Sequence, residues 1–169
     1  MKPRSVFLVG PPGAGKSTIG RMLAAKLGFD FVDTDHIIEQ RTGADISWIF
    51  DVEGEAGFRE REHQILAEVS LTPSIVAATG GGIVLREDNR AILHGLDAVV
   101  YLNAGLEQLV ERTSKDKKRP LLQVENPKAR IEALLNERRP LYEAVADFCI
   151  TTDGQSPKST VQSILNLIS

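Results

Sequence analysis

The sequence contains a single cysteine, so it cannot form an internal disulfide bond or a cysteine metal cluster. It also lacks a basic excess, because the net charge is -3, and this argues against nucleic acid or a membrane surface as a partner. The first apolar stretch, residues 6–9, is too short for a signal peptide. We therefore expect a cytoplasmic protein, with Cys149 in the core because it stands in an apolar run.

Apolar residues make up 42% of the chain and charged residues 25%, which is typical of a soluble globular protein. We expect residues 1–169 to form a single domain, because this length is enough to bury one core. Short apolar segments alternate with helical patterns, and they cover residues 6–9, 29–32, 74–78, 98–102 and 148–151. This alternation predicts an α/β fold, a doubly wound five-stranded parallel sheet with helices on both faces.

A glycine-rich loop follows the first apolar segment. Gly10, Gly15, Lys16 and Ser17 match the pattern G-x-x-x-x-G-K-[ST], between a predicted strand and a predicted helix. Glycines let backbone N–H groups surround phosphate oxygens, and the start of a helix favours negative charge. Lys16 adds a mobile positive charge, and the Ser17 hydroxyl offers an oxygen to Mg²⁺. Motif, flanks and position favour a nucleoside triphosphate site over an ordinary glycine-rich turn.

Two carboxylates stand at the end of the second predicted strand, in the sequence Asp33-Thr34-Asp35. In an open parallel sheet, ligands gather at the carboxyl ends of the strands. A kinase needs one acid near Mg²⁺ and one near the acceptor hydroxyl, and this pair could supply both. The alternative is that Asp33 or Thr34 only caps the helix that begins at His36.

A long helix is predicted over residues 55–71. Its inward face is formed by Phe58, Glu62, Ile65, Leu66 and Val69. Arg59 precedes Glu62 by three residues, so the two side chains can pair on the helix. An acid on an inward face needs such a partner. The alternative is that Arg59 and Glu62 form a plain ion pair on the surface, which would contribute little.

Gly80, Gly81 and Gly82 follow the third predicted strand, where many P-loop ATPases carry an acid that activates water. Nothing in this loop can activate water, so the phosphoryl acceptor is expected to be another group. Three consecutive glycines are costly to order. Close approach of a ligand to bare backbone explains them better than an ordinary turn.

The C-terminal half holds a basic segment between two predicted helices. Residues 113–122 are polar, basic and proline-containing, and they resemble a mobile flap beside the core, although a solvated charged loop is the alternative. The next helix, residues 127–146, is expected to be interrupted at Arg138-Arg139-Pro140. The last helix is expected to open at Pro157, with Ser156 as its N-cap.

The order of these motifs resembles the shikimate kinase family over nearly the whole chain. The motifs are G-P-P-G-A-G-K-S, D-T-D, F-R-x-x-E, T-G-G-G, K-R-P-L-L and R-R-P-L-Y. The resemblance implies a P-loop fold similar to that of nucleoside monophosphate kinases, with a substrate-binding segment at about 34–62 and a lid at about 113–124. It also implies a monomer that uses ATP and Mg²⁺ to phosphorylate the 3-hydroxyl of shikimate.

The resemblance further implies roles for individual residues. Lys16, Asp35 and Arg119 would be catalytic, and Glu62 would orient Arg59. ATP would be bound by Gly13, Ala14, Gly15, Lys16, Ser17, Thr18, Arg112, Arg119 and Pro157, and the metal by Ser17 and Asp33. Shikimate would be bound by Asp35, Arg59, Gly80, Gly81, Gly82 and Arg138, in a pocket walled by Ile46, Phe50 and Phe58. Arg139 is the alternative to Arg138, because both are basic.

Two other functions remain open at this point. Another P-loop metabolite kinase, for example one acting on gluconate, would keep the nucleotide half and change the acceptor pocket. A nucleotide-dependent switch would bind ATP without fast turnover, but the basic flap and the paired aspartates argue against it.

Overall fold

The computed structural model describes residues 3–113 and 126–169, and within them it contains five strands and seven helices. The strands are β1 (Ser5–Val9), β2 (Asp30–Asp33), β3 (Ile75–Ala78), β4 (Val99–Asn103) and β5 (Phe148–Thr151). The helices are α1 (Lys16–Leu27), α2 (Thr34–Thr42), α3 (Ile46–Val69), α4 (Glu87–His94), α5 (Leu106–Thr113), α6 (Pro127–Val145) and α7 (Pro157–Ile168). Arg119 and all but the first residue of the predicted lid lie outside the described residues.

The strands form one parallel sheet in the order β2-β3-β1-β4-β5, which confirms the predicted fold class. Leu8 of β1 and Asp33 of β2 both pair with Ala78 of β3, so the carboxyl ends of these three strands lie level. The loops that follow them therefore meet at one edge of the sheet. These loops are the P-loop, the Asp33-Thr34-Asp35 segment and the glycine turn at residues 80–82.

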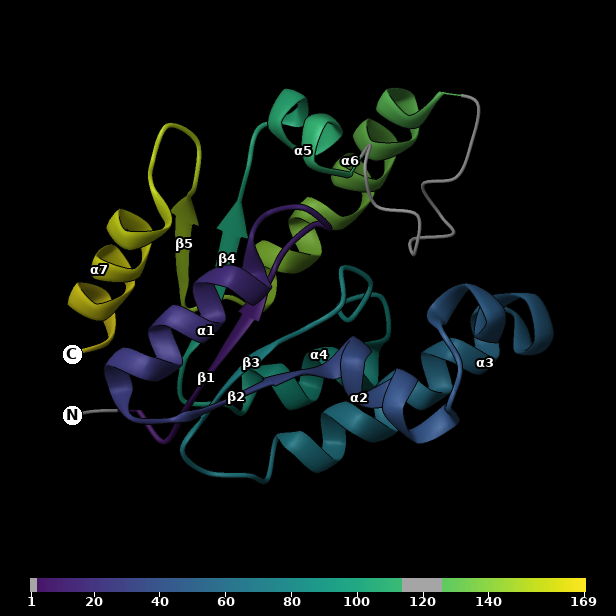
Figure 1. The fold of residues 1–169 in the computed structure, drawn as a ribbon, viewed down its shortest axis with the longest axis horizontal. Helices are drawn as coiled ribbons and strands as arrows, with labels where there is room; N and C mark the ends of the chain where they lie inside the picture. Colours follow the sequence, from purple (N-terminus) through teal and green to yellow (C-terminus); the bar gives the residue numbers. More distant parts are fainter. Residues whose placement is uncertain (1–2, 114–125) are drawn as a thin grey trace.

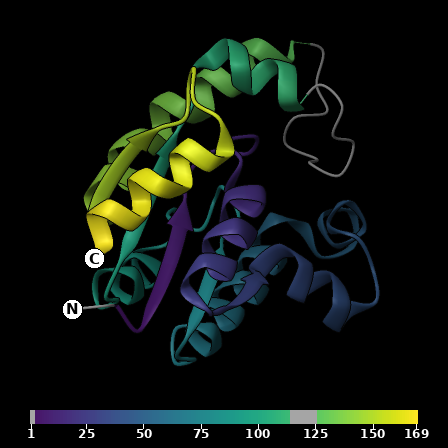
Figure 2. The same cartoon turned by 60° about the vertical axis from the view of Figure 1, so that its left-hand side comes forward.

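Helices cover both faces of the sheet. Val6 and Leu8 of β1 belong to a core cluster that includes residues of α1 and α7, whereas Phe7 and Val9 belong to a second cluster with residues of α3 and α4. All four side chains are fully buried, as expected for the central strand of a parallel sheet. Figures 1 and 2 show α1 and α7 side by side on one face, with α3 and α4 on the other.

Helix α3 begins at residue 46, well before the predicted start at residue 55. Two helical segments meet at Gly54, which has φ 75° and ψ 174°. This conformation breaks the helix and is open to glycine at little cost, so the chain changes direction there. The inward face of the second segment is as predicted, because Phe58, Ile65 and Leu66 are all buried.

Two expectations about the C-terminal region are wrong. Helix α6 continues through Pro140 without the expected interruption. Proline cannot bond to the carbonyl group of Asn136, but Asn136 is exposed, so water can satisfy that group. Cys149 is exposed and not in the core, because β5 is an edge strand and Cys149 lies on its less covered side.

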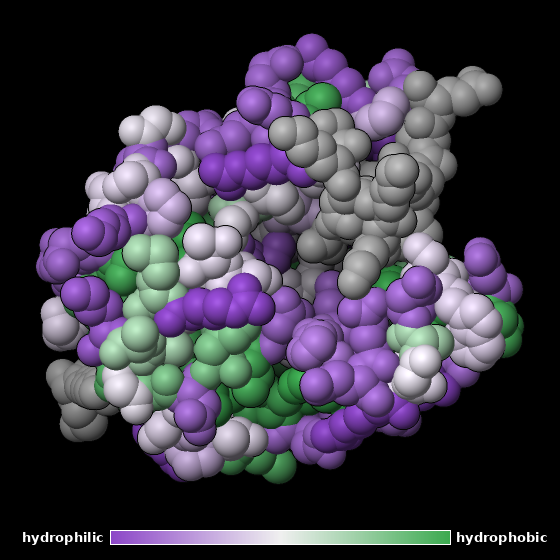
Figure 3. Space-filling view, in the orientation of Figure 1, coloured by the Kyte–Doolittle hydropathy of each residue, from purple (hydrophilic) through white to green (hydrophobic). Residues whose placement is uncertain are grey.

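Hydrophilic side chains cover much of the face shown in Figure 3, and hydrophobic atoms are most visible in its lower half. Across residues 3–113 and 126–169, no helix is both long enough and apolar enough to cross a membrane.

Candidate active site

The P-loop connects β1 to α1 and depends on glycine at several positions. Gly13 and Gly15 have φ of 86° and 95°, in the left-handed region. A Cβ on Gly10 would lie 2.5 Å from the carbonyl oxygen of Leu102, which leaves no room for a side chain. Lys16 is buried, and its Nζ donates to the carbonyl oxygens of Gly10 at 2.6 Å and Pro11 at 2.8 Å. The ammonium group therefore lies against its own loop, close to the start of α1.

Asp33 contacts both the P-loop and α2. The Ser17 hydroxyl donates to Asp33 Oδ2 at 2.8 Å. The other oxygen, Oδ1, accepts from the backbone N–H groups of Asp35 at 3.0 Å and His36 at 3.3 Å, which makes Asp33 the N-cap of α2. Asp33 therefore both caps α2 and contacts Ser17 of the P-loop. A hydroxyl and a carboxylate oxygen at this spacing are hard ligands that suit Mg²⁺.

The glycine turn at residues 80–82 lies against charged side chains from α2 and α3. A Cβ on Gly80 would lie 2.7 Å from Asp35 Oδ1 and 2.9 Å from Glu62 Oε2, and one on Gly82 would lie 2.5 Å from Arg59 Cζ. Any side chain here would displace these groups. The glycines therefore let two carboxylates and a guanidinium group approach the backbone that follows β3.

Arg59 and Glu62 form a largely buried ion pair. Arg59 Nη1 donates to Glu62 Oε1 at 3.0 Å, and Glu62 is fully buried. The pKa of Glu62 is raised to about 7, mainly by burial and also by the nearby charge of Asp35, while the positive charges of Arg59 and Arg138 oppose the increase. The expected pairing is confirmed, and the surface ion pair is excluded.

Arg138 reaches the same region from α6. It is only 4% exposed, whereas Arg139 is exposed. Among residues 3–113 and 126–169, the Nε of Arg138 and the Oε2 of Glu62 have no hydrogen-bond partner. Buried polar groups are normally satisfied, so water or a polar ligand can pair with these two atoms. The burial of Arg138 therefore favours it over Arg139 as the arginine that contacts a bound anion.

Sequence reasoning missed the part played by Tyr142 of α6. Its hydroxyl donates to the carbonyl oxygen of Gly81 at 2.5 Å, and its ring stacks on Tyr101 with centroids 5.0 Å apart. Burial raises the pKa of Tyr142, so the hydroxyl stays a donor. The Tyr142 side chain therefore connects α6 to the glycine turn. The R-R-P-L-Y motif contained this residue, but only the fold pairs it with Gly81.

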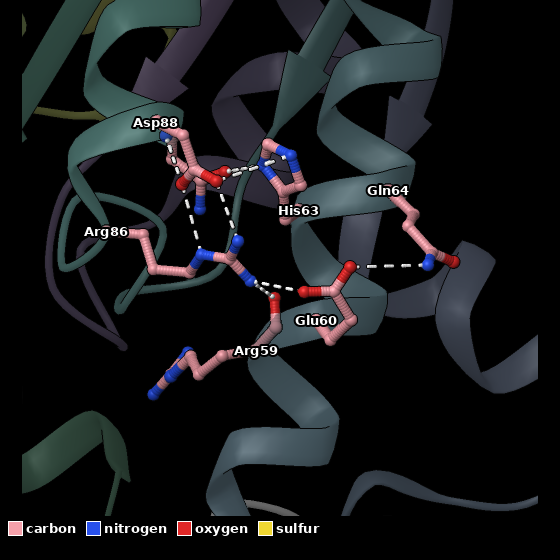
Figure 4. A network of polar contacts seen from close by, with 7 residues as sticks. Arg59, Glu60, His63, Gln64, Arg86 and Asp88 are labelled. Carbon is pink, nitrogen blue, oxygen red and sulfur yellow. Dashed lines mark hydrogen bonds and ion pairs between the residues drawn. The ribbon is translucent and has the colours of Figure 1, made fainter.

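A second missed feature is the polar cluster in Figure 4. Arg86 Nη1 donates to Glu60 Oε2 at 2.8 Å and to the carbonyl oxygen of Arg59 at 3.5 Å. Its other nitrogens bind the carboxylate of Asp88. The side chain of Arg59 points away from this cluster (Figure 4). Arg86 thus ties the chain after the glycine turn to the backbone of α3 at the residue whose side chain enters the site.

The predicted walls of the pocket lie on α3. Phe50 and Phe58 are in contact, with ring centroids 4.9 Å apart, and Arg59 lies over the ring of Phe58 at 5.2 Å. Ile46 packs against the same core cluster. Phe58 is therefore the one of these three side chains for which a contact with a charged group of the site is shown.

Of the predicted nucleotide residues outside the P-loop, Arg112 and Pro157 lie within the described residues, whereas Arg119 does not. Arg112 of α5 is exposed, and its Nη1 donates to the carbonyl oxygen of Gly13 at 2.9 Å. Pro157 is the first residue of α7, after the N-cap Ser156. A residue earlier in the same loop, Asp153, accepts from the backbone N–H of Gly105, so this loop lies against the start of α5.

The shikimate kinase family model matches residues 12–169 of the chain. A shikimate kinase of Actinobacillus pleuropneumoniae serotype 5b is 53% identical over 98% of this chain and 95% of its own length. One of Vibrio parahaemolyticus serotype O3:K6 is 54% identical over 98% of this chain and 96% of its own length.

Solved structures agree with these sequence matches. The shikimate kinase of Acinetobacter baumannii in complex with shikimate has a TM-score of 0.96 and 48% identity, and the match covers 99% of this chain and 93% of that one. The shikimate kinase of Aquifex aeolicus has a TM-score of 0.84 and 32% identity, over 96% of this chain and 94% of that one. Sequence, fold and site geometry agree, and the chain belongs to the shikimate kinase family of P-loop enzymes.

Proposed function

We propose that this protein transfers the γ-phosphoryl group of ATP to the 3-hydroxyl of shikimate. The observation that carries the proposal is that a P-loop and a cluster of largely buried charged side chains meet at the level ends of β1, β2 and β3. The P-loop suits a nucleoside triphosphate, whereas the arginines of the pocket suit a small organic anion. The Acinetobacter relative was solved with shikimate bound, which supports this choice of acceptor.

On the donor side, we propose that residues 13–18 bind the ATP phosphates and that Arg112 and Pro157 flank the base. Lys16 would stabilise the charge that develops on the transferred group. Ser17 and Asp33 would hold Mg²⁺ directly or through water, since both present oxygens within hydrogen-bond distance of each other. Bound Mg²⁺ would supply charge neutralisation at the phosphates. Arg119 is proposed as a phosphate contact from a lid at about 113–124.

On the acceptor side, we propose that Arg59 and Arg138 bind the shikimate carboxylate, with Glu62 holding Arg59 in place. Guanidinium groups match a carboxylate in shape and charge. Asp35 would bind the hydroxyl groups and accept the proton of the 3-hydroxyl, because its carboxylate faces the glycine turn near Glu62. The backbone of residues 80–82 would line the floor of this pocket.

An ADP-coupled assay with shikimate, gluconate and no added acceptor tests the proposal. We expect rapid, Mg²⁺-dependent turnover only with shikimate. Turnover with gluconate would favour the rival metabolite kinase, and ATP binding without any acceptor-dependent turnover would favour a switch.

Asp35→Asn should lower kcat more than it weakens shikimate binding, because the amide keeps the shape but cannot accept the proton. Size-exclusion chromatography checks the monomer that we also propose.

A further inference from the structure

A short chain of polar groups connects the loop before α7 to the P-loop. Asp153 Oδ1 accepts from the backbone N–H of Gly105 at 2.9 Å and from the side-chain amide of Gln108 at 2.5 Å. The Gln108 carboxamide oxygen accepts from Arg112 Nη2 at 2.7 Å. Arg112 Nη1 donates in turn to the Gly13 carbonyl oxygen at 2.9 Å. The neighbouring groups assign this amide orientation, because only then do both ends of the carboxamide meet a complementary partner. We call Asp153, Gln108 and Arg112 the relay.

The backbone brings the members of the relay together. Gln108 and Arg112 are four residues apart on α5, so they lie on the same side of the helix. Strands β4 and β5 pair, with Asn103 opposite Thr151, so the loops that follow them are neighbours. A Cβ on Gly105 would lie 2.8 Å from Asp153 Oδ2, and the absence of a side chain there lets the carboxylate reach the start of α5. The relay thus joins β5, α5 and the P-loop.

The chemistry of the middle residue suits a site for a polyphosphate. A carboxamide can accept from a guanidinium group and donate to a carboxylate at the same time, which no acidic side chain does when ionised. It also carries no charge. A carboxylate in direct contact with Arg112 would offset the positive charge that the P-loop needs when it binds an anion. Gln108 instead orients Arg112 and keeps the negative charge of Asp153 farther away.

We infer that Gln108 is a positioning residue for the nucleotide: supported by Asp153, it holds Arg112 against the P-loop so that the guanidinium group is ready for a nucleoside di- or triphosphate. This inference rests on the proposed function, because it assumes that the P-loop binds ATP. It assigns Gln108 and Asp153 to the donor half of the site. The acceptor pocket lies at the ends of β2 and β3, so shikimate binding should not depend on the relay.

The test compares Gln108→Met and Gln108→Glu with the wild-type protein in equilibrium binding of ATP, ADP and shikimate. We expect Gln108→Met to weaken ATP and ADP binding by about threefold to tenfold, the effect of one lost hydrogen-bond link. Gln108→Glu should weaken it at least as much, since the new charge lies beside Asp153 and offsets Arg112. Shikimate binding should stay within about twofold of wild type. Gln162→Met is the matched control, because the amide of Gln162 on α7 donates to Asn166 of its own helix, outside the relay and the proposed site.

Testing Gln108→Met in protein that already carries Arg112→Ala distinguishes a loss of Arg112 positioning from a general loss of structure. In Arg112→Ala protein, Gln108→Met should have no further effect on ATP binding, because the group that it orients is gone. An ATP affinity within twofold of wild type for Gln108→Met, or an equal loss in both backgrounds, would overturn the inference. Gln108→Glu protein that binds ATP like wild type would refute the need for a neutral residue. Wild-type protein that bound no ATP would refute the proposed nucleotide site and, with it, the relay's role.

Discussion

Replacing Glu62 by glutamine removes a charge from the fully buried face of α3. The carboxylate accepts from Arg59 at 3.0 Å, and it lies close to the glycine turn and Asp35. Burial is the largest cause that raises the pKa of Glu62 from 4.5 to about 7, and the arginines compensate only in part. Glutamine keeps the size of the side chain without its charge. The substitution therefore measures how much free energy of unfolding is lost by burying a carboxylate at this position.

The direction in which the free energy of unfolding changes with pH follows from the protonation of Glu62 in the folded and unfolded states. Below about pH 4.5 the carboxyl group is protonated in both the folded and the unfolded state, so the raised pKa has no effect. Between pH 4.5 and about 7 the unfolded chain releases this proton while the folded protein keeps it, so the free energy of unfolding falls. Above about pH 7 both states release the proton, so the free energy of unfolding falls no further on account of Glu62. At about 1.4 kcal/mol for each pH unit, the total is about 3 kcal/mol.

Urea unfolding of wild type and Glu62→Gln at pH 5, 6, 7 and 8 measures this difference. Relative to wild type, the variant should become more stable as pH rises, and the gap should widen by about 2 kcal/mol between pH 5 and pH 8. Glu132→Gln, at an exposed position of α6, controls for the loss of a glutamate in general. A gap that stays constant or narrows with rising pH would refute the reasoning.

Three further predictions concern the site. Lys16→Met should fold normally and lose phosphoryl transfer by orders of magnitude in the ADP-coupled assay, because charge at the transferred phosphate is no longer stabilised; near wild-type turnover would contradict the assignment. Arg138→Ala should weaken shikimate binding by about 2–5 kcal/mol, the range for a buried charge pair, whereas exposed Arg139→Ala should change it by under 1 kcal/mol. Equal losses in titrations of the two variants would rule out this distinction. Tyr142→Phe should lower the free energy of unfolding by about 1–3 kcal/mol, because the buried Gly81 carbonyl loses its donor, and unchanged urea stability would count against that hydrogen bond.

The sequence was sufficient to predict the sheet and the main residues around it. Each predicted strand was a short apolar run, and each loop carried its own local signal, such as the P-loop glycines. Because the strands are parallel, their carboxyl ends meet at one edge, so the loops could be grouped without knowing any contact. The pairing of Arg59 with Glu62 was also predictable, because it depends only on helical spacing.

Contacts between distant segments could not be predicted in this way. The hydrogen bond from Tyr142 to Gly81 joins residues 61 positions apart, and the link from Arg112 to Gly13 joins residues 99 positions apart. No periodicity encodes such pairs. The error over Cys149 had the same origin, because its exposure follows from the place of β5 at the sheet edge, which is a property of strand order and not of the local run.

Two buried polar atoms of the proposed acceptor site lack a hydrogen-bond partner within residues 3–113 and 126–169. They are Glu62 Oε2 and Arg138 Nε, and a buried polar atom that stays unpaired costs about 1–3 kcal/mol. A ligand with a carboxylate offers an acceptor to the guanidinium group, and one with hydroxyl groups offers a donor to the carboxylate. A ligand that has both removes both costs at once, whereas a neutral sugar leaves the arginine unsatisfied. Under the proposed function, these two atoms would therefore favour a hydroxylated acid over a neutral sugar.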